Sequence, residues 1–302
     1  DRICIRDNTK SASIITTAEL PCAAACPGPV PPVPWSPADL GAALTLWIDP
    51  SDAGTITGVG SAISQIDDKA GVVPGISFQQ SVLSQQPTVL LYDGLNWMSF
   101  DGVNDQLLGR KGGPADLYLS DIFGSVRAPG TTFEVHLVMR PDNNFGCGGS
   151  CGNNSANPWS NTPVFAADQG YFGIFVKDMD TATPDMQVSI RETAGWAGRD
   201  TTYPGATGVQ QVFGMSMTDP GASPLTGPYY TYEDGVATTI AGVTEVGFPA
   251  YTTNPVHFGS MGWAFTYHYR GLIGEMLVFD RELTPAERTN MTTYLSAKWG
   301  TP

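Results

Sequence analysis

The chain has 302 residues, of which 41% are hydrophobic and 15% charged, and its formal net charge at pH 7 is −14. This apolar content suffices for one large domain plus an arm, or for two small domains, and it excludes disorder throughout. Acidic residues outnumber basic ones and no lysine or arginine cluster stands out, so attraction to phosphate backbones and anionic lipid is missing. We therefore expect neither nucleic acid nor a membrane as a partner.

No apolar run approaches the roughly 20 residues of a membrane-spanning helix. No charged segment followed by an apolar stretch resembles a signal peptide either. The chain starts at Asp1 rather than at a methionine, which indicates either a processed start or a piece of a longer product.

The five cysteines fall into an N-terminal group, Cys4, Cys22 and Cys26, and a loop pair, Cys147 and Cys151. Glycines around the loop pair would let a tight loop close on a disulfide, with free thiols and a metal site as the alternatives. No histidine lies near enough in sequence to complete an obvious zinc motif. Cys22 and Cys26 have the same C-x3-C spacing as the loop pair, and the leftover cysteine of the N-terminal group could pair with another chain outside the reducing cytosol.

Residues 1–26 mix polar and β-branched residues without sustained periodicity, and they could add as a strand to another protein's sheet. Six of the eleven residues from Pro27 to Pro37 are proline, which predicts a stiff polyproline-like spacer. A proline-rich ligand for an adaptor domain is the other interpretation. We predict an anchoring arm over 1–26, a linker over 27–37 and one domain over 38–302.

After the spacer, short apolar runs are bounded by Gly, Pro, Asn and Asp, and several of them alternate with period two, as strands with one buried face do. The runs are 44–48, 97–100, 133–139, 171–176, 186–190, 212–217, 229–232, 256–258 and 271–279. Residues 233–235, Glu-Asp-Gly, predict a hairpin turn. We expect roughly ten or more antiparallel strands in two sheets.

One helix is expected, close to the C-terminus. Thr284 is its predicted N-cap, Pro285 its first residue and Glu287 the partner in a capping box, and the helix should run to about Lys298. Arg288 is expected along its edge. Three apolar residues at helical spacing should pack it against the sandwich: Met291, Leu295 and Trp299.

Four stretches in a fixed order carry a family resemblance: 46–57, 63–71 with 85–88, 98–107, and 271–300. The third contains Phe100-Asp101-Gly102-Val-Asn-Asp105-Gln-Leu107, which matches a Phe-Asp-Gly-x-x-Asp-x-Leu pattern. Together they resemble laminin-G-like, concanavalin-type jelly-roll domains that recur in bacteriophage virion proteins and in some bacterial surface proteins. The resemblance implies an all-β, antiparallel two-sheet sandwich with a C-terminal helix and an extended N-terminal arm.

The acidic residues of these stretches are interpreted mainly as structural. Asp49, Asp52, Asp101 and Asp105 stand beside Gly, Ser and Asn, where carboxylates cap turns by accepting backbone N–H bonds. A structural calcium site is the alternative. Glu275 is expected to form a sheet-surface ion pair with Arg281 or Arg270.

Enzyme motifs are missing from the sequence. The three histidines, His136, His257 and His268, lie in strand-like runs without a nucleophile elbow or a zinc-binding helix. No strand carries the alternating carboxylates of jelly-roll glycosidases. We therefore expect no enzyme, with a polysaccharide hydrolase as the least favoured alternative.

Exposed aromatic residues could stack on sugar rings. The candidates for ligand binding are Trp159, Trp196 with Tyr203, and Trp263 with Tyr267 and Tyr269.

The leading hypothesis is a non-enzymatic virion structural protein, a head decoration, collar or fibre. It would be exposed at the virion surface, contact other virion proteins through residues 1–36 and could form a homotrimer. The alternative is a glycan-binding adhesin that attaches to host-surface glycans.

Overall fold

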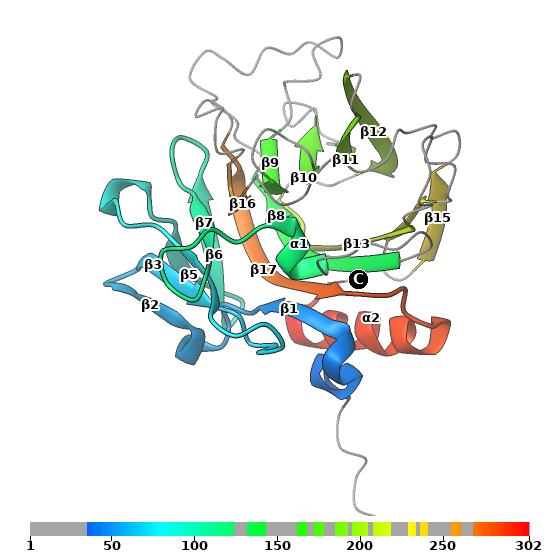
Figure 1. Cartoon of the computed structure of the whole chain (residues 1–302), viewed down its shortest axis with the longest axis horizontal. Helices are drawn as coiled ribbons and strands as arrows, with labels where there is room; N and C mark the ends of the chain where they lie inside the picture. Colours follow the sequence, from blue (N-terminus) through cyan, green and yellow to red (C-terminus); the bar gives the residue numbers. More distant parts are fainter. Residues whose placement is uncertain are drawn as a thin grey trace, which may run out of the picture. The chain divides into compact units, whose positions relative to one another are not determined.

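A computed structural model describes residues 35–123, 132–142, 162–167, 172–177, 185–192, 195–204, 208–218, 229–233, 236–240, 255–260 and 268–301 (Figure 1). The chain divides into two units, residues 1–34 and 35–302. The boundary between these units falls inside the proline-rich segment 27–37. All described residues belong to the second unit.

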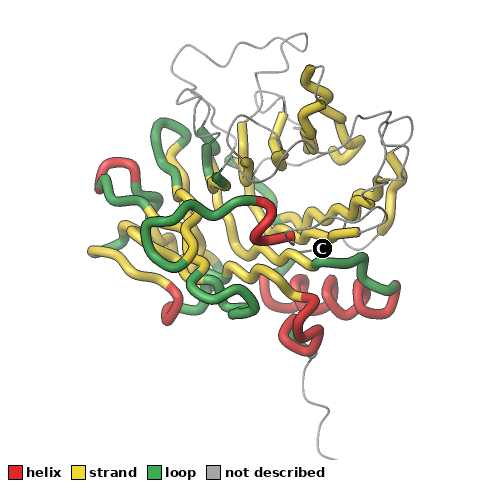
Figure 2. Tube along the Cα trace, in the orientation of Figure 1, coloured by secondary structure: helices red, strands yellow, loops and turns green. Residues whose placement is uncertain are grey.

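The second unit is built almost entirely from antiparallel strands (Figure 2). The 17 strands are β1 (Leu44–Ile48), β2 (Ile56–Val59), β3 (Ala62–Asp67), β4 (Ile76–Gln79), β5 (Thr88–Tyr92), β6 (Leu95–Asp101), β7 (Leu107–Lys111), β8 (Thr132–Pro141), β9 (Thr162–Ala167), β10 (Phe172–Lys177), β11 (Asp185–Glu192), β12 (Gly195–Pro204), β13 (Gln211–Thr218), β14 (Tyr229–Glu233), β15 (Val236–Ile240), β16 (Val256–Phe258) and β17 (Arg270–Phe279). The α-helices are α1 (Leu119–Phe123) and α2 (Pro285–Trp299), and three short 3₁₀ segments are η1 (Pro37–Ala43), η2 (Ala53–Thr55) and η3 (Leu83–Gln85).

The strand pairings form two groups. In the first, β17 pairs with β1, β6 and β8, and the sheet continues from β8 through β13 and β14 to β15. In the second, β3, β4, β7, β16, β9, β10, β11 and β12 follow one another, with β2 beside β3. A single pair, Ala62 with Thr88, joins the two groups through β3 and β5.

The main core lies between the two sheets. Its residues alternate along each strand, as in β8, where Phe133, Val135, Leu137 and Met139 face inward. The second sheet contributes inward residues such as Phe78, on β4. Phe78, Phe165 and Phe258 pack against one another with ring centroids 4.6 to 6.3 Å apart. The predicted all-β sandwich is therefore confirmed.

Helix α2 covers the other face of the first sheet, below β17 in Figure 1. Thr284 and Glu287 form the predicted capping box, and Gly300 ends the helix in a left-handed conformation. The predicted apolar residues Met291, Leu295 and Trp299 are all buried there. No helix among the described residues combines the length and the apolar character needed to cross a membrane.

Two glycines permit local geometry that other residues would disturb. Asp93 and Gly94 both have positive φ, 50° and 79°, and form the two-residue turn that joins β5 to β6. A Cβ on Gly274 would lie 2.9 Å from Trp97 and 3.1 Å from Trp299, whose rings pack edge to face below β17. Strand β17 therefore needs a glycine where the helix approaches it.

The predicted hairpin at 233–235 joins β14 to β15, which pair from Glu233 and Val236 outward. Residues 234 and 235 of its turn lie outside the described residues.

Candidate functional site

Strand alternation places two carboxylates under helix α2. On β17, Glu275 is two residues from Leu277, and on β8, Glu134 is two residues from His136, so both side chains leave the sheet on the helix side. Both carboxylates are fully buried. A buried carboxylate needs a cation and several hydrogen-bond donors, and α2 supplies the cations.

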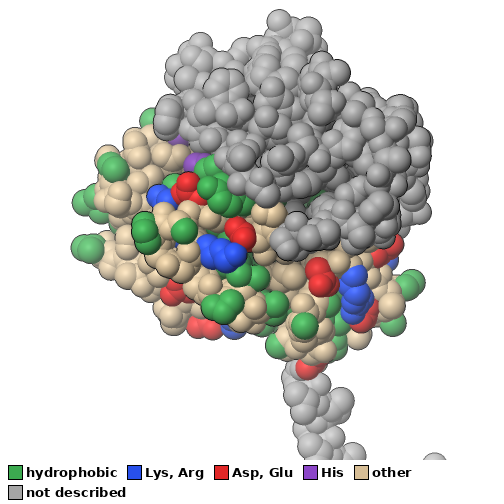
Figure 3. Space-filling view, in the orientation of Figure 1, with side chains coloured by type: hydrophobic (Ala, Val, Ile, Leu, Met, Phe, Trp, Pro, Cys, Tyr) green, Lys and Arg blue, Asp and Glu red, His purple; other side chains and the backbone are tan. Residues whose placement is uncertain are grey.

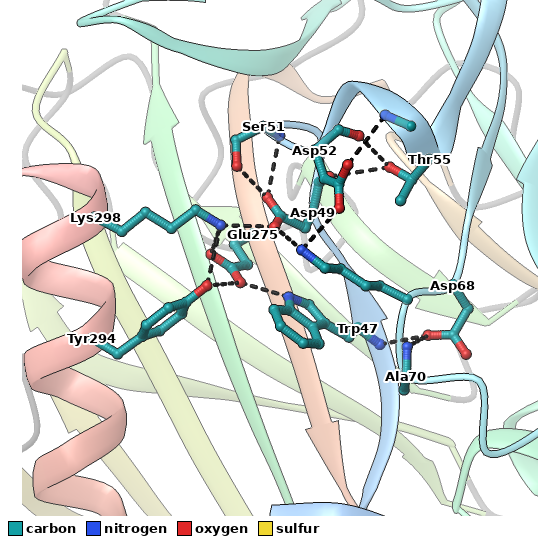
Figure 4. Close-up of polar contacts among 12 residues, drawn as sticks. Trp47, Asp49, Ser51, Asp52, Thr55, Asp68, Ala70, Glu275, Tyr294 and Lys298 are labelled. Carbon is teal, nitrogen blue, oxygen red and sulfur yellow. Dashed lines mark hydrogen bonds and ion pairs between the residues drawn. The ribbon is translucent and has the colours of Figure 1, made fainter. Parts of the chain in front are cut away.

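The first group of contacts surrounds Glu275 and is called the Glu275 cluster: Trp47, Asp49, Glu275, Tyr294, Lys298 and Trp299. Figure 4 shows the first five of these residues. The indole N–H groups of Trp47 and Trp299 each donate to Glu275 at 2.6 Å. Tyr294 donates its hydroxyl at 3.0 Å and Lys298 its ammonium at 2.8 Å. The predicted surface ion pair of Glu275 with Arg281 or Arg270 is wrong, because α2 covers this strand.

Asp49, just beyond the end of β1, joins this cluster and is 2% exposed. Its Oδ2 lies 2.8 Å from the Lys298 ammonium and 3.1 Å from that of Lys69. Its Oδ1 accepts from the Ser51 amide at 3.2 Å and the Ser51 hydroxyl at 2.6 Å. Lys69 also lies 3.0 Å from Asp52, whose carboxylate accepts from the Gly54 amide.

The surroundings shift the pKa values of Glu275 and Asp49 in opposite directions. Burial raises the pKa of Glu275, and the neighbouring Asp49 charge adds to this effect. Burial also acts on Asp49, but the Lys298 ammonium, the Ser51 hydrogen bond and Lys69 hold the pKa of Asp49 below its usual value. Glu275 is therefore the better proton acceptor of the pair.

The second group, the Glu134 cluster, consists of Glu134, His136 and Arg288. Arg288 donates to both carboxylate oxygens of Glu134, from Nε at 3.0 Å and from a terminal nitrogen at 2.8 Å. His136 Nε2 lies 2.7 Å from the same carboxylate, and the Leu283 amide donates to it at 2.9 Å. Arg288 is thus buried against the sheet, and the prediction that it lies along the helix edge is wrong.

A third acidic feature is the turn from Asp101 to Asp105. Asp101 Oδ1 accepts the backbone N–H groups of Val103, Asn104 and Asp105, and Asp105 Oδ2 accepts the Asp101 N–H at 2.9 Å. Burial and the Asp101 charge raise the pKa of Asp105 to about 7. All four predicted aspartates therefore bind backbone amides, lysines or both.

A calcium ion was the alternative prediction for the four aspartates, and at Asp49 and Asp52 the structure places a lysine instead. The Lys69 ammonium lies within 3.1 Å of both Asp49 and Asp52, so a protein cation already lies between these carboxylates. Among the residues that the structure describes, no three His, Cys, Asp or Glu side chains are grouped to hold a metal ion.

On the second sheet, a polar row of paired residues that alternate with the core residues includes Gln65 and Gln79, which are half-buried, and His257, which is only 7% exposed. Paired residues of neighbouring strands share a face, and here Gln65, Gln79, Leu108 and His257 follow one another across β3, β4, β7 and β16. Burial and the charge of Arg110 lower the pKa of His257 to about 4, so its ring is neutral at pH 7. Within the described residues, neither ring nitrogen of His257 has a hydrogen-bond partner.

Most of the aromatic candidates for ligand binding lie outside the residues or side chains that the structure describes. Trp159, Trp263 and Tyr267 lie outside the described residues, as do Cys4, Cys22, Cys26, Cys147 and Cys151. Trp196 and Tyr203 belong to β12, whose backbone alone is described. Tyr269 is fully buried and packs on Phe100, so the prediction that it faces a ligand is wrong.

The two clusters beneath α2 could not be assembled from the sequence. A usable signal was present in the spacing, because Asp49 follows Trp47 by two residues and Lys298 follows Tyr294 by four. The sequence did not indicate which strands the helix covers.

Replacing Glu134 with Gln should destabilise the fold by about 3 kcal/mol, because the buried Arg288 charge loses its carboxylate. The matched control is Glu282→Gln, since Glu282 also lies near Arg288 but its side chain is 44% exposed, and its loss should cost under about 1 kcal/mol. Urea unfolding of both variants measures the difference. Equal losses would contradict the structural role of the Glu134 cluster.

The raised pKa of Asp105 predicts a pH dependence. Because the folded pKa, about 7, exceeds the unfolded value, this group stabilises the fold most at low pH, and its contribution is lost as pH rises from about 4 to about 7. The Asp105→Asn variant should therefore gain stability relative to wild type over this range, by up to ~1 kcal/mol per pH unit. Urea unfolding across the range tests this, and a constant difference would refute it.

Comparisons with known proteins bear on the fold. No protein-family model matches the chain, and no curated protein matches it. Among solved structures, a tryptophan-to-alanine mutant of HCR/D is 10% identical with a TM-score of 0.51, over 87% of this chain and 56% of that one. Domain 4 of AbnA, a GH43 extracellular arabinanase from Geobacillus stearothermophilus in complex with arabinotriose, is 14% identical with a TM-score of 0.49, over 82% and 98%. A Trypanosoma rangeli sialidase is 13% identical with a TM-score of 0.49, over 86% of this chain but only 34% of that one. At these identities the likeness concerns the fold alone.

Proposed function

We propose that this protein is a non-enzymatic display protein of a virion surface, in which an N-terminal arm anchors the chain and the sandwich projects outward. The observation that carries the proposal is that the buried acidic side chains bind other groups of the protein. In the described residues the buried carboxylates are those of Asp49, Asp105, Glu134 and Glu275, and each accepts hydrogen bonds from the protein itself. They support the fold instead of facing a substrate.

The division of the chain supports the same proposal. Residues 1–34 form a unit separate from the sandwich, and Trp35, the first residue of the second unit, packs edge to face on Tyr294 of α2. The sandwich thus has its own defined beginning. On the face drawn in Figure 3, acidic and basic side chains are interspersed, as on a surface that remains in solvent.

Attachment to particles that lack the protein tests this division of roles. The full chain should attach, whereas a chain lacking residues 1–36 should remain in solution with an unchanged circular dichroism spectrum. Equal attachment of both chains, or of neither, would contradict anchoring by the arm. The full chain with Thr293→Ala, a change on the exposed side of α2, is the control and should attach normally.

A second function, glycan binding, is favoured by the polar row on the second sheet. The row continues through small residues, Ala166, Gly173, Ser189 and Gly198, on β9 to β12. In the backbone register of β12, Gly198 pairs with Ser189 and Trp196 with Arg191. The half-buried amide side chains of Gln65 and Gln79 suit uncharged hydroxyl groups, because an amide can both donate and accept a hydrogen bond.

Titration with glycans of a host cell surface tests the second function. Gln79→Ala and Trp196→Ala should each weaken binding about tenfold or more, because each removes one polar or stacking contact. Thr293→Ala should leave the affinity unchanged. Glycan binding that survives both substitutions would place the ligand elsewhere, and no binding by wild type would remove this second function while leaving the display role intact.

A further inference from the structure

Lys298 of α2 lies at equal distance from two carboxylates, that of Asp49 just beyond the end of β1 and that of Glu275 on β17. Its Nζ lies 2.8 Å from Asp49 Oδ2 and 2.8 Å from Glu275 Oε2 (Figure 4). The Lys298 side chain is 18% exposed, that of Asp49 2% and that of Glu275 0%. The structure therefore holds three groups together away from bulk water. They are the Lys298 amine, the Asp49 carboxyl group that it can attack, and the Glu275 carboxyl group that can accept its protons.

We propose that Lys298 and Asp49 condense within the folded chain to an isopeptide bond between Nζ and Cγ, with Glu275 as the proton carrier. The bond would covalently join the end of β1 to the last turn of α2. It needs no cofactor and no external reagent, because the only by-product is water.

The atoms balance as follows. The Lys298 ammonium passes one proton to Glu275, and the freed lone pair of Nζ attacks Asp49 Cγ. As the C–N bond forms, the nitrogen gives up a second proton, and the C–Oδ2 bond breaks. Both protons end on the departing oxygen, which leaves as water, and Glu275 returns to its initial state. The product is a neutral secondary amide.

The surroundings of each reacting atom fit these roles. Asp49 Oδ1, where negative charge develops during the attack, already accepts from the Ser51 amide and hydroxyl, the arrangement of an oxyanion hole. Oδ2, the departing oxygen, has the Lys69 ammonium 3.1 Å away as a further donor. Ser51 and Lys69 thus stabilise the charge on the two oxygens separately.

Glu275 is equipped to take a proton and to return it. The two indole N–H groups and the Tyr294 hydroxyl fix its position beside Nζ. Burial raises the pKa of Glu275, which favours transfer of a proton from the ammonium.

Lys69 is the competing amine, and it is less suited. Its side chain is 31% exposed and it contacts Asp52, which is 41% exposed. Although burial opposes it, Asp52 and Asp49 hold the pKa of Lys69 above its usual value. An amine that stays protonated has no free lone pair, so Lys69 should remain an ammonium.

The intact mass of the full chain, reduced to open any disulfide, tests the proposal directly. We expect a mass about 18 Da, one water, below that calculated from the sequence. Trypsin should then yield peptide 11–69 joined through Asp49 to the C-terminal peptide that begins at residue 289, because the acylated Lys298 is no longer cleaved. The full calculated mass, a loss of water without a linked peptide, or a link at Lys69 would overturn the proposal.

Variants then test the individual roles. Lys298→Arg keeps the positive charge but has no nucleophilic amine, and Glu275→Gln keeps the side-chain shape but cannot carry a proton, so both should show their full calculated masses. Lys111→Arg is the matched control, because Lys111 pairs with Asp121 and not with Asp49 or Glu275, and this variant should still lose about 18 Da. A linked Glu275→Gln chain would overturn the role of Glu275. If that variant does not fold, the wild-type mass and peptide map still decide whether the bond exists.

Discussion

The structure depends on neutralising two carboxylates that the first sheet presents to helix α2. Glu134 and Glu275 are both fully buried, and each is paired with a cation from the helix, Arg288 near its start and Lys298 near its end. Removal of the helix would leave two uncompensated charges on the sheet, a cost of several kcal/mol for each. The helix and the sandwich are therefore expected to fold as one cooperative unit.

This constraint also decides which surfaces remain for ligands. The first sheet uses one face for the main core, and on the other α2 packs against residues of β1, β8 and β17. The second sheet packs on the core through residues such as Phe78 and Phe258, and in the row that alternates with them Gln65 and Gln79 are half-buried whereas His257 is buried. Gln65 and Gln79 are therefore the residues of this row at which a binding function is best tested.

Local features of the fold were predictable because they depend on neighbours in sequence. The capping box of Thr284 and Glu287 and the helical spacing of Met291, Leu295 and Trp299 fixed where α2 begins and which side it buries. The partners of Glu275 and Arg288 were not predictable, because they lie on other elements that only the folded chain brings together: Trp47 on β1 and three residues of α2 for Glu275, and Glu134 on β8 for Arg288. The same holds for Tyr269, whose burial depends on packing against Phe100 and not on its own aromatic run.

The Glu275 cluster poses an energetic problem that a covalent bond would relieve. Two buried carboxylates and the Lys298 ammonium must be held without water, and replacing such groups by neutral ones often stabilises a protein. Condensation of Lys298 with Asp49 would replace one buried ion pair by a neutral amide, which is less costly to bury. Glu275 would keep the hydrogen bonds from Trp47, Trp299 and Tyr294. The close approach of the buried Lys298, Asp49 and Glu275 makes the ionised cluster energetically costly, and the same close approach favours the bond between Lys298 and Asp49.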